Sequence, residues 1–182
     1  MTSFYSEEEL KSLGLKHYGK NVLISRKCSI YSAESISIGN HVRIDDFCIL
    51  SGEITIGDYC HISAYSVLYG SKGIILEGYC GISPRCTVLS ATDDFSGEYL
   101  VGAQFPNDYT NVTGGTVVLS KYSQLGANTV VFPTITIGTG AVTGAMTLVN
   151  KNLDPWTINT GIPVNKSKPR SKRLLEKIKE MI

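Results

Sequence analysis

The sequence predicts an all-β protein in which short strands wind into a parallel β-helix. An aliphatic residue recurs every six positions, the next residue is often glycine, and the residue four positions later is usually small or β-branched. A period of six fits neither an α-helix nor a simple alternating strand. One short strand and one turn per six residues explain it, because three such units form a triangular coil whose amides pair with coils stacked at about 4.8 Å. The recurring positions are Ile38, Ile44, Leu50, Ile56, Ile62, Leu68, Leu76, Ile82, Val88, Leu119, Leu125, Val131, Ile137, Thr143 and Val149.

The chain divides into a cap and a repeat region. Residues 1–19 are expected to form an N-terminal helical cap, because Ser6 and Glu9 have the spacing of a capping box ahead of several leucines. Residues 20–166 form the β-helix, with six coils expected to begin near residues 20, 38, 56, 76, 116 and 137.

Two segments fall outside the repeat. Residues 94–115 carry no repeat phase and are rich in glycine, so they should leave the β-helix as an external loop, and long loops of this kind are usually functional. Residues 167–182 are expected to form a C-terminal helix. Its apolar face would consist of Leu174, Leu175, Ile178 and Ile182.

Composition narrows the range of functions. A chain of 182 residues suffices for one compact domain, and a formal net charge of +1 gives no electrostatic case for nucleic acid or an anionic membrane. No apolar run approaches the roughly 20 residues of a membrane span, and the first residues lack the features of a signal peptide. We therefore expect a cytoplasmic protein.

The cysteines are the first candidates for chemistry. All five stand four residues after an inward position, and none forms a CxxC pair. A free cysteine behaves as a small buried hydrophobe, whereas a zinc site needs suitably spaced ligands. We therefore interpret them as core residues and expect no metal site. They are Cys28, Cys48, Cys60, Cys80 and Cys86.

Three polar side chains are better candidates for catalysis. His61 precedes the inward Ile62, so it should project outward from the middle of the β-helix. Asp93 and Asp94 stand together at the root of the external loop. Acidic pairs at such places often only form turns, so structural and functional roles both stay open.

The C-terminal coils resemble a known family. Residues 137–166 match the hexapeptide-repeat acyltransferases of the galactoside and maltose O-acetyltransferase type, including the closing turn at Gly161, Ile162 and Pro163. The resemblance extends over nearly the whole chain. It implies a left-handed parallel β-helix of hexapeptide repeats, a homotrimer with sites between neighbouring subunits, and acetyl-CoA bound along the C-terminal coils as acyl donor.

A closer resemblance is to the dTDP-viosamine N-acetyltransferases of bacterial surface-polysaccharide synthesis. It implies an acceptor such as dTDP-4-amino-4,6-dideoxyglucose and a role in making lipopolysaccharide O-antigen. The matching segments are residues 4–14, 21–25, 42–57, 61–70, 93–97 and 161–164.

Family roles carried over residue by residue define a candidate site. The general-base histidine of the galactoside type falls on Asp93, with Asp94 beside it, so the expected base is missing. The acceptor-binding asparagine falls on Asp45, beside Arg43, and the residue that flanks the thioester from the next subunit falls on Gln124. The resemblance assigns coenzyme contacts to Gly126, Ala127, Gly144, Ala145, Lys151, Pro163 and Lys166.

The missing histidine favours an amine as the acceptor. A sugar hydroxyl needs a positioned base, which contributes about 10²–10⁴-fold in rate. An amine with a pKa near 8 is substantially unprotonated in the cell and needs less help once it is held in place. Asp93 or Asp94 would then bind the ammonium, accept a proton, or do both.

Three other functions would fit parts of the pattern. O-acetylation of a galactoside-like or maltose-like sugar would use the same scaffold. A carbonic-anhydrase-like zinc enzyme would need three histidines, whereas only His41 and His61 are central in the sequence. A non-catalytic solenoid would need neither the external loop nor the C-terminal resemblance. The sequence therefore predicts an acyl-CoA-dependent acetyltransferase of an amino sugar.

Overall fold

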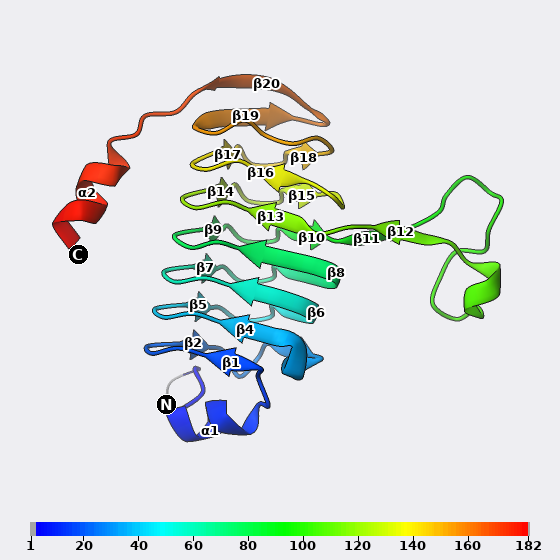
Figure 1. The fold of residues 1–182 in the computed structure, drawn as a ribbon, viewed down its shortest axis with the longest axis horizontal. Helices are drawn as coiled ribbons and strands as arrows, with labels where there is room; N and C mark the ends of the chain where they lie inside the picture. Colours follow the sequence, from blue (N-terminus) through cyan, green and yellow to red (C-terminus); the bar gives the residue numbers. More distant parts are fainter. Residues whose placement is uncertain (1–2, 182) are drawn as a thin grey trace.

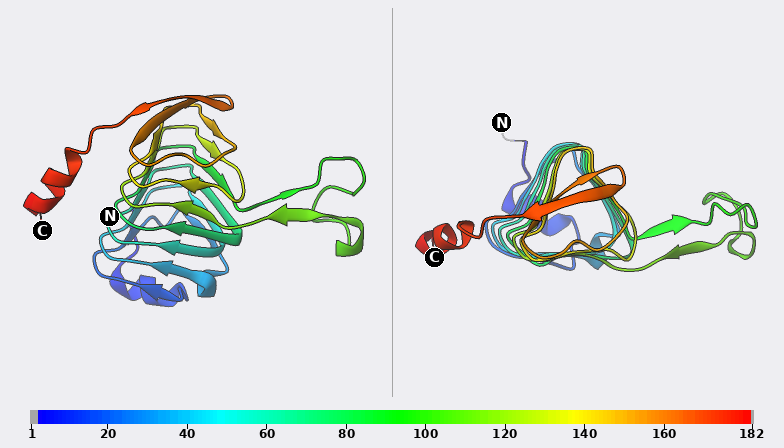
Figure 2. Two further views of the ribbon diagram at one scale, coloured as in Figure 1. Left: turned by 45° about the horizontal axis from the view of Figure 1, so that its top comes forward. Right: turned by 90° about the horizontal axis from the view of Figure 1, so that it is seen from above.

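The computed structural model describes residues 3–181 and is a parallel β-helix with a triangular cross-section, as predicted (Figures 1 and 2). An arm leaves one corner of the prism, and the C-terminal helix leaves another (Figure 2). Neither α-helix has the length and apolar character needed to cross a lipid bilayer.

The strands lie on three sides of this prism. The first side holds β1 (His17–Tyr18), β4 (Ile36–Ile38), the second half of β6 (Ile49–Ile56), the second half of β8 (Val67–Leu76), β13 (Val117–Leu119) and β16 (Thr136–Ile137). The second side holds β2 (Leu23–Ile24), β5 (Arg43–Ile44), β7 (His61–Ile62), β9 (Gly81–Ile82), β14 (Gln124–Leu125), β17 (Val142–Thr143) and β19 (Thr157–Gly161). The third side holds β3 (Ser29–Tyr31), the first halves of β6 and β8, β10 (Thr87–Leu89), β15 (Val130–Val131) and β18 (Leu148–Val149).

The recurring inward positions form the core, as predicted. Every one of them is at most 6% exposed, including the polar Thr143. The Thr143 hydroxyl is satisfied inside the core, because it accepts a hydrogen bond from the Gly126 amide at 2.9 Å and shares one with Thr129 at 2.8 Å. A polar side chain is therefore tolerated at this inward position.

The corner between the first and second sides carries a ladder of aromatic side chains. His41, Tyr59, Tyr79, Tyr122 and Trp156 each take a left-handed backbone conformation there. Such a conformation costs an L-residue roughly 1–2 kcal/mol. The rings stack between coils, with centroids 4.6 Å apart for the first pair and 4.9 Å for the second, which offsets part of that cost.

The cysteines are core residues, as predicted from their phase. Four are buried, Cys28 is half-buried, and all five are free thiols. The sulfur atoms of four of them contact backbone carbonyls of a neighbouring coil, as Cys86 Sγ does with Gly126 O at 3.2 Å. They fill the small space inside the corners.

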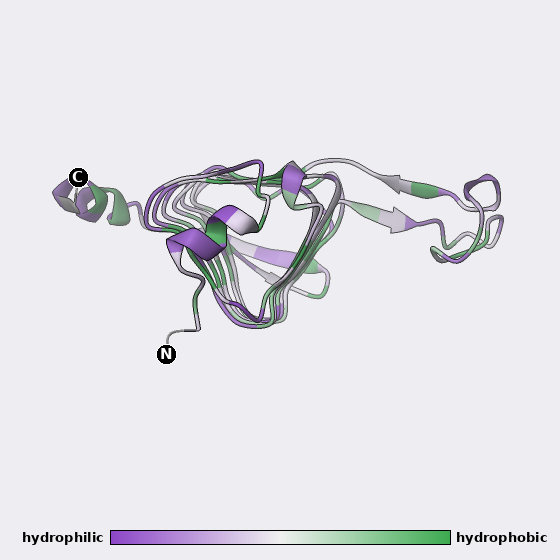
Figure 3. Ribbon diagram, turned by 90° about the horizontal axis from the view of Figure 1, so that it is seen from below, coloured by the Kyte–Doolittle hydropathy of each residue, from purple (hydrophilic) through white to green (hydrophobic). Residues whose placement is uncertain are grey.

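The N-terminal cap forms as predicted. In α1 (Glu7–Ser12) the Ser6 hydroxyl accepts from the Glu9 amide, and the Glu9 carboxylate accepts from the Ser6 amide at 2.7 Å. Hydrogen bonds from the Ser6 backbone and from Arg26 lower the pKa of Glu9 to about 2. Leu10 is buried, and α1 lies across the open end of the prism (Figure 3). Beyond α1, a 3₁₀ turn (Ala33–Ser35) precedes β4.

The external segment is a β-ribbon at its base rather than a loop throughout. Strands β11 (Ala91–Asp93) and β12 (Val112–Gly114) pair antiparallel and carry the arm away from the prism (Figure 1). The excursion therefore starts at Ala91, before the predicted residue 94. A 3₁₀ turn (Asn107–Tyr109) lies near the tip.

The C-terminal helix begins later than predicted. Strand β20 (Val164–Pro169) pairs antiparallel with β19 and covers the last coil, and α2 spans only Leu174–Met181. The reason is local, because a residue that precedes proline disfavours helical backbone and Lys168 precedes Pro169. Ile182, placed on the predicted apolar face, lies outside the described residues.

Candidate active site

The second side of the prism presents two parallel columns of outward side chains. Residues directly before the inward position form one column, and residues directly after it form the other, because side chains alternate along a strand. In the first column, from the N-terminal coil onward, are Leu23, Arg43, His61, Gly81, Gln124, Val142 and Ile158. In the second column are Asp45, Ser63, Ser83, Gly126, Gly144 and Thr160.

A charged cluster joins the predicted residues Arg43, Asp45 and His61. The Arg43 Nε donates to Asp45 Oδ1 at 2.7 Å, and His61 Nε2 lies 2.7 Å from Asp45 Oδ2. The Asp45 side chain is only 19% exposed, whereas the other two are about half exposed. Burial raises the pKa of Asp45, but hydrogen bonds from Arg43 and His61 outweigh it and lower that pKa. Asp45 is therefore an anion that orients both neighbours.

This cluster faces a small hollow. Arg43, Asp45 and Asp46 line a cavity of about 320 Å³ together with Ser3, Phe4 and Ala64. The Arg43 guanidinium lies over the Phe4 ring, 5.2 Å from its centroid. The hollow thus offers one guanidinium and two carboxylates to a polar ligand, and His61 lies beside it through its contact with Asp45.

Gln124 lies two strands further along the same side. Its Nε2 donates to the Tyr79 carbonyl at 3.2 Å, and its amide lies across Gly81. A Cβ atom on Gly81 would overlap Gln124 Oε1. The missing side chain of Gly81 therefore makes a notch that the Gln124 amide fills.

Near its C-terminal end, this side carries glycine at two successive outward positions. A Cβ on Gly126 would lie 2.6 Å from the backbone of Gly144, and one on Gly144 would lie 2.6 Å from Thr160, so both positions exclude larger residues. Ala127 and Ala145 follow at the corner and are at least partly exposed. The outward surface therefore has no large side chain at Gly126 or Gly144.

The remaining predicted coenzyme residues do not all share this end. Lys166 on β20 pairs with Thr160 and lines a hollow of about 290 Å³. Pro163 is exposed in the turn between β19 and β20. Lys151 is exposed after β18 on the third side, so the structure separates it from Lys166 by a side of the prism.

The acidic pair has divided roles in the arm. Asp94 accepts hydrogen bonds from the Ser96 amide and from Asn111 Nδ2, both at 2.8 Å, and these bonds lower its pKa. Its carboxylate thus closes the base of the arm. The neighbouring Asp93 is half-buried and lines a cavity of about 650 Å³ with Tyr69 and Phe105 among others.

The arm and the second side do not meet within one subunit. The arm follows β10 and precedes β13, so it leaves the corner between the third and first sides, which is opposite the second side (Figure 2). Asp93 and the Arg43–Asp45–His61 cluster consequently belong to different parts of the surface.

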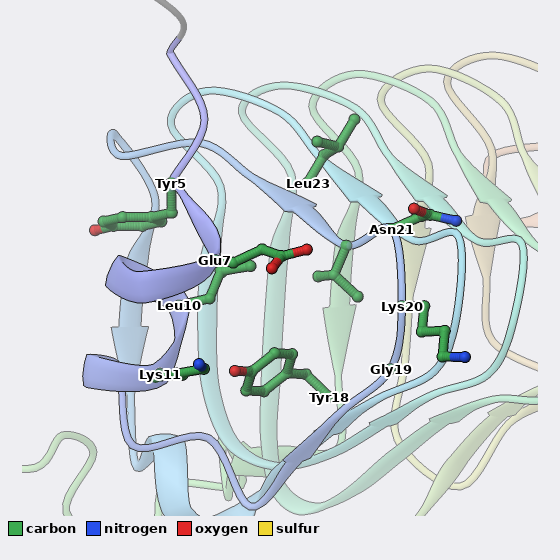
Figure 4. A pocket seen from close by; sticks show the side chains of 10 residues that line it. Tyr5, Glu7, Leu10, Lys11, Tyr18, Gly19, Lys20, Asn21 and Leu23 are labelled. Atoms are coloured by element: carbon green, nitrogen blue, oxygen red, sulfur yellow. The ribbon is translucent and has the colours of Figure 1, made fainter.

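Another hollow lies between α1 and the first coil. Figure 4 shows Tyr5, Glu7 and Lys11 facing Tyr18 and Lys20 across a cavity of about 580 Å³. It contains none of the predicted site residues. Within residues 3–181, no cluster of three or more His, Cys, Asp or Glu side chains is placed to hold a metal ion.

Comparison with known proteins shows which family the chain belongs to. Residues 35–70 match the family pattern described as bacterial transferase hexapeptide (six repeats). A dTDP-4-amino-4,6-dideoxy-D-glucose acyltransferase from Escherichia coli is 40% identical over 177 residues, which cover 96% of this chain and 92% of that relative. The chain belongs to the dTDP-4-amino-4,6-dideoxyglucose acyltransferase family. It is therefore an acyl-CoA-dependent N-acyltransferase, which confirms the predicted enzyme class.

Solved structures of this family extend the comparison. AntD, an N-acyltransferase from Bacillus cereus, was solved in complex with dTDP and 3-hydroxybutyryl-CoA; it is 52% identical, with a TM-score of 0.97 and coverage of 100% of this chain and 97% of that one. A variant of AntD holds dTDP-4-amino-4,6-dideoxyglucose and coenzyme A, at 51% identity and a TM-score of 0.96. A maltose O-acetyltransferase from Clostridium difficile 630, at 20% identity and a TM-score of 0.55, shares the fold alone.

Within this family's scaffold, Ser83 is a candidate that sequence reasoning missed. It is half-buried on the second side, directly after the inward Ile82 of β9. It occupies the same column as Asp45, which the six-residue phase alone could have revealed. Strand β9 lies between the charged cluster on β5 and β7 and the glycine positions on β14 and β17.

Proposed function

We propose that this enzyme transfers an acetyl group from acetyl-CoA to the 4-amino group of dTDP-4-amino-4,6-dideoxyglucose. The observation that carries the proposal is the order of groups along the second side. A polar, charged hollow lies toward one end, a track lined by Gly126 and Gly144 lies toward the other, and β9 with Gly81 and Ser83 lies between them. Homologous AntD holds both an acyl-CoA and a dTDP compound.

In this proposal each end of the second side binds one substrate. Arg43, Asp45 and His61 bind the polar acceptor, since together they offer charges of both signs. The pantetheine group of the coenzyme lies along the track lined by Gly126 and Gly144 and hydrogen-bonds to exposed backbone groups. The coenzyme contacts are assigned to Gly126, Ala127, Gly144, Ala145, Pro163 and Lys166, with Lys151 as a phosphate contact from the third side.

The amine and the thioester then meet over β9. The amine nitrogen bonds to the carbonyl carbon, the carbon–sulfur bond breaks, and coenzyme A leaves as a thiolate that is protonated as the nitrogen loses its proton. The Ser83 hydroxyl can donate to the developing oxyanion, which is a common source of rate enhancement. Gln124 flanks the thioester.

We assign to Asp93 the role of the carboxylate that binds the acceptor amine. Its carboxylate lines an open cavity, whereas that of Asp94 is already bonded to Ser96 and Asn111. AntD variants were solved with a substitution at a serine and at an aspartate ten positions after it. Ser83 and Asp93 have the same spacing and nearly the same place in the chain.

A homotrimer would bring the two halves of this site together. Asp93 and Ser83 lie on opposite parts of one subunit, so a neighbour must supply one of them. The arm is also strongly apolar for an exposed element, with Phe95 76% and Tyr109 62% exposed. Large exposed apolar surfaces of this kind typically contact another protein surface.

Mass spectrometry of reactions with acetyl-CoA tests the proposal. The protein is offered dTDP-4-amino-4,6-dideoxyglucose, its 4-hydroxy counterpart as the matched control, and a set of other dTDP- and UDP-linked amino sugars. We expect an added mass of one acetyl group on the 4-amino sugar and none on the hydroxy control. Acetylation of the hydroxy sugar at a similar rate would instead support O-acetylation.

A further inference from the structure

The first outward column of the second side has bulky side chains on both sides of Gly81. His61 precedes it and Gln124 follows it, one coil away in each direction. Gly81 has no positive φ, so neither a turn nor left-handed backbone requires glycine there. Glycine at this position instead leaves a space on the strand surface where a side chain would otherwise lie.

That space holds a side chain that can move. Atoms of the Gln124 carboxamide are the nearest neighbours of a Cβ built on Gly81, and no backbone atom is among them. By contrast, the space beside Gly126 is closed by the backbone of Gly144 and Ala145. The Gly81 notch is therefore filled by the end of a flexible side chain, which can leave it.

The Gln124 amide is held loosely. Its one hydrogen bond among the described residues is the 3.2 Å contact from Nε2 to the Tyr79 carbonyl. Gln124 is half-buried. A single neutral hydrogen bond at a partly exposed site contributes only modestly to the preference for one rotamer.

The notch lies where the proposed function puts the acyl group. The acceptor residues are on β5 and β7, the coenzyme track is on β14 and β17, and Gly81 is on the strand between them. An acyl chain that points from the thioester toward the strand surface meets Gly81 and the Gln124 amide first.

We propose that Gln124, folded over Gly81, sets the upper size of the acyl group that the enzyme transfers. The inference rests on the proposed function and adds a specificity-determining pair to it. With the amide in the notch, the site accommodates an acetyl group. Truncation of Gln124 to alanine removes four heavy atoms, which is enough space for the two additional carbons of a butyryl group.

The test is the ratio of kcat/KM for butyryl-CoA to that for acetyl-CoA, with dTDP-4-amino-4,6-dideoxyglucose as acceptor. Each buried methylene is worth roughly fourfold in binding, so two are worth about fifteenfold. We expect wild type to prefer acetyl-CoA and Gln124→Ala to raise the ratio by at least about tenfold. Gln124→Asn, which keeps the amide but shortens it by one carbon, should raise it less.

A second substitution tests whether the gain comes from the notch. Gly81→Ala in the Gln124→Ala background places a methyl group in the vacated space, so it should reverse most of the gain in the ratio. Leu23→Ala is the matched control, because Leu23 belongs to the same column at its far end. Its ratio should equal that of wild type, and thermal unfolding reports whether each variant is folded.

Three results would overturn the inference. One is a wild-type enzyme that uses butyryl-CoA as well as acetyl-CoA. Another is a set of folded Gln124 and Gly81 variants that acetylate the sugar with an unchanged ratio, in which case the proposed function stands without the size limit. The last is a set of folded proteins, wild type included, that acylate no amino sugar with either donor, in which case the proposed function fails as well.

Discussion

The carboxylates of the candidate site differ in how many hydrogen bonds they already accept within the protein. Asp94 has both carboxylate oxygens hydrogen-bonded within the arm, whereas Asp93 lines an open cavity at the base of the arm. Asp45 is intermediate. Both of its carboxylate oxygens have partners, but these partners, Arg43 and His61, are themselves about half exposed to solvent. These differences decide which substitutions affect catalysis and which affect stability.

Substitution of the two arm aspartates by asparagine should separate their roles. Asp93→Asn removes the charge that holds the acceptor amine, so kcat/KM for the amino sugar should fall at least about tenfold, or roughly 1.4 kcal/mol. Asp94→Asn weakens the turn at the base of the arm, so it should lower the thermal unfolding temperature slightly and affect the rate less. Steady-state kinetics and thermal unfolding measure both. Equal and normal rates in the two variants would remove the acid pair from the mechanism.

The Asp45 cluster predicts a dependence of stability on pH. Because the pKa of Asp45 is lowered in the folded state, its contribution is present above the unfolded value near 3.9 and is lost as pH falls through the folded value. Asp45→Asn should therefore destabilise the protein at pH 7 by about 1 kcal/mol and lessen the further loss on acidification below about pH 4. Urea unfolding at several pH values measures this, with the exposed Asp154→Asn as control. Parallel curves for wild type and Asp45→Asn would contradict the assignment.

Elements in this fold are stabilised by repetition between coils. Each strand is only a few residues long, and its backbone bonds run to the coils before and after it. Because the coils are stacked closely, a glycine on the second side is essential where the next coil's backbone lies against it and replaceable where only a side chain does. Gly126 is enclosed by the backbone of the next coil, whereas Gly81 is covered only by a side chain.

Two glycine-to-alanine variants test this distinction. Gly126→Ala forces two coils apart and should cost about 1–3 kcal/mol, as overpacking of a core does. Gly81→Ala displaces only the Gln124 amide and should cost well under 1 kcal/mol. Thermal unfolding of the two variants compares them, since each kcal/mol corresponds to roughly 2–4 °C in a domain of this size. Equal destabilisation would mean that Gln124 is fixed more rigidly than one hydrogen bond implies.

At the scale of the whole molecule, Asp93 in the arm and Ser83 on the second side lie on opposite parts of the surface. The arm leaves the corner opposite the second side (Figure 2). Its large apolar side chains are exposed. A site that needs both Asp93 and Ser83 is consequently incomplete in a monomer. A trimer in which each arm reaches the second side of a neighbour would complete three such sites.

Mixed oligomers test the shared site. Asp93→Asn and Ser83→Ala should each be slow alone, but subunits of both kinds assembled together should recover part of the wild-type rate, because some sites then combine two intact halves. Light scattering should give a trimer for wild type. Absence of recovery in verified mixed trimers would place both residues in one subunit's site, and a monomeric but fully active wild type would exclude the shared site altogether.

The sequence by itself determined the β-helix, its inward positions, its buried cysteines and its N-terminal cap. These follow from a local rule, since one six-residue unit repeats and each inward position is defined by its phase. The resemblance carried by scattered segments added the chemistry of an amino-sugar acyltransferase.

Only the tertiary structure decided the rest. The ribbon at the base of the arm pairs Ala91 with Gly114, and β20 pairs Lys168 with Ile158, and neither antiparallel pairing follows the repeat. The contact of His61 with Asp45, and that of Asn111 with Asp94, likewise join residues sixteen or more positions apart. Such contacts depend on how the coils and the arm are placed in space, and no periodic pattern in the chain records that placement.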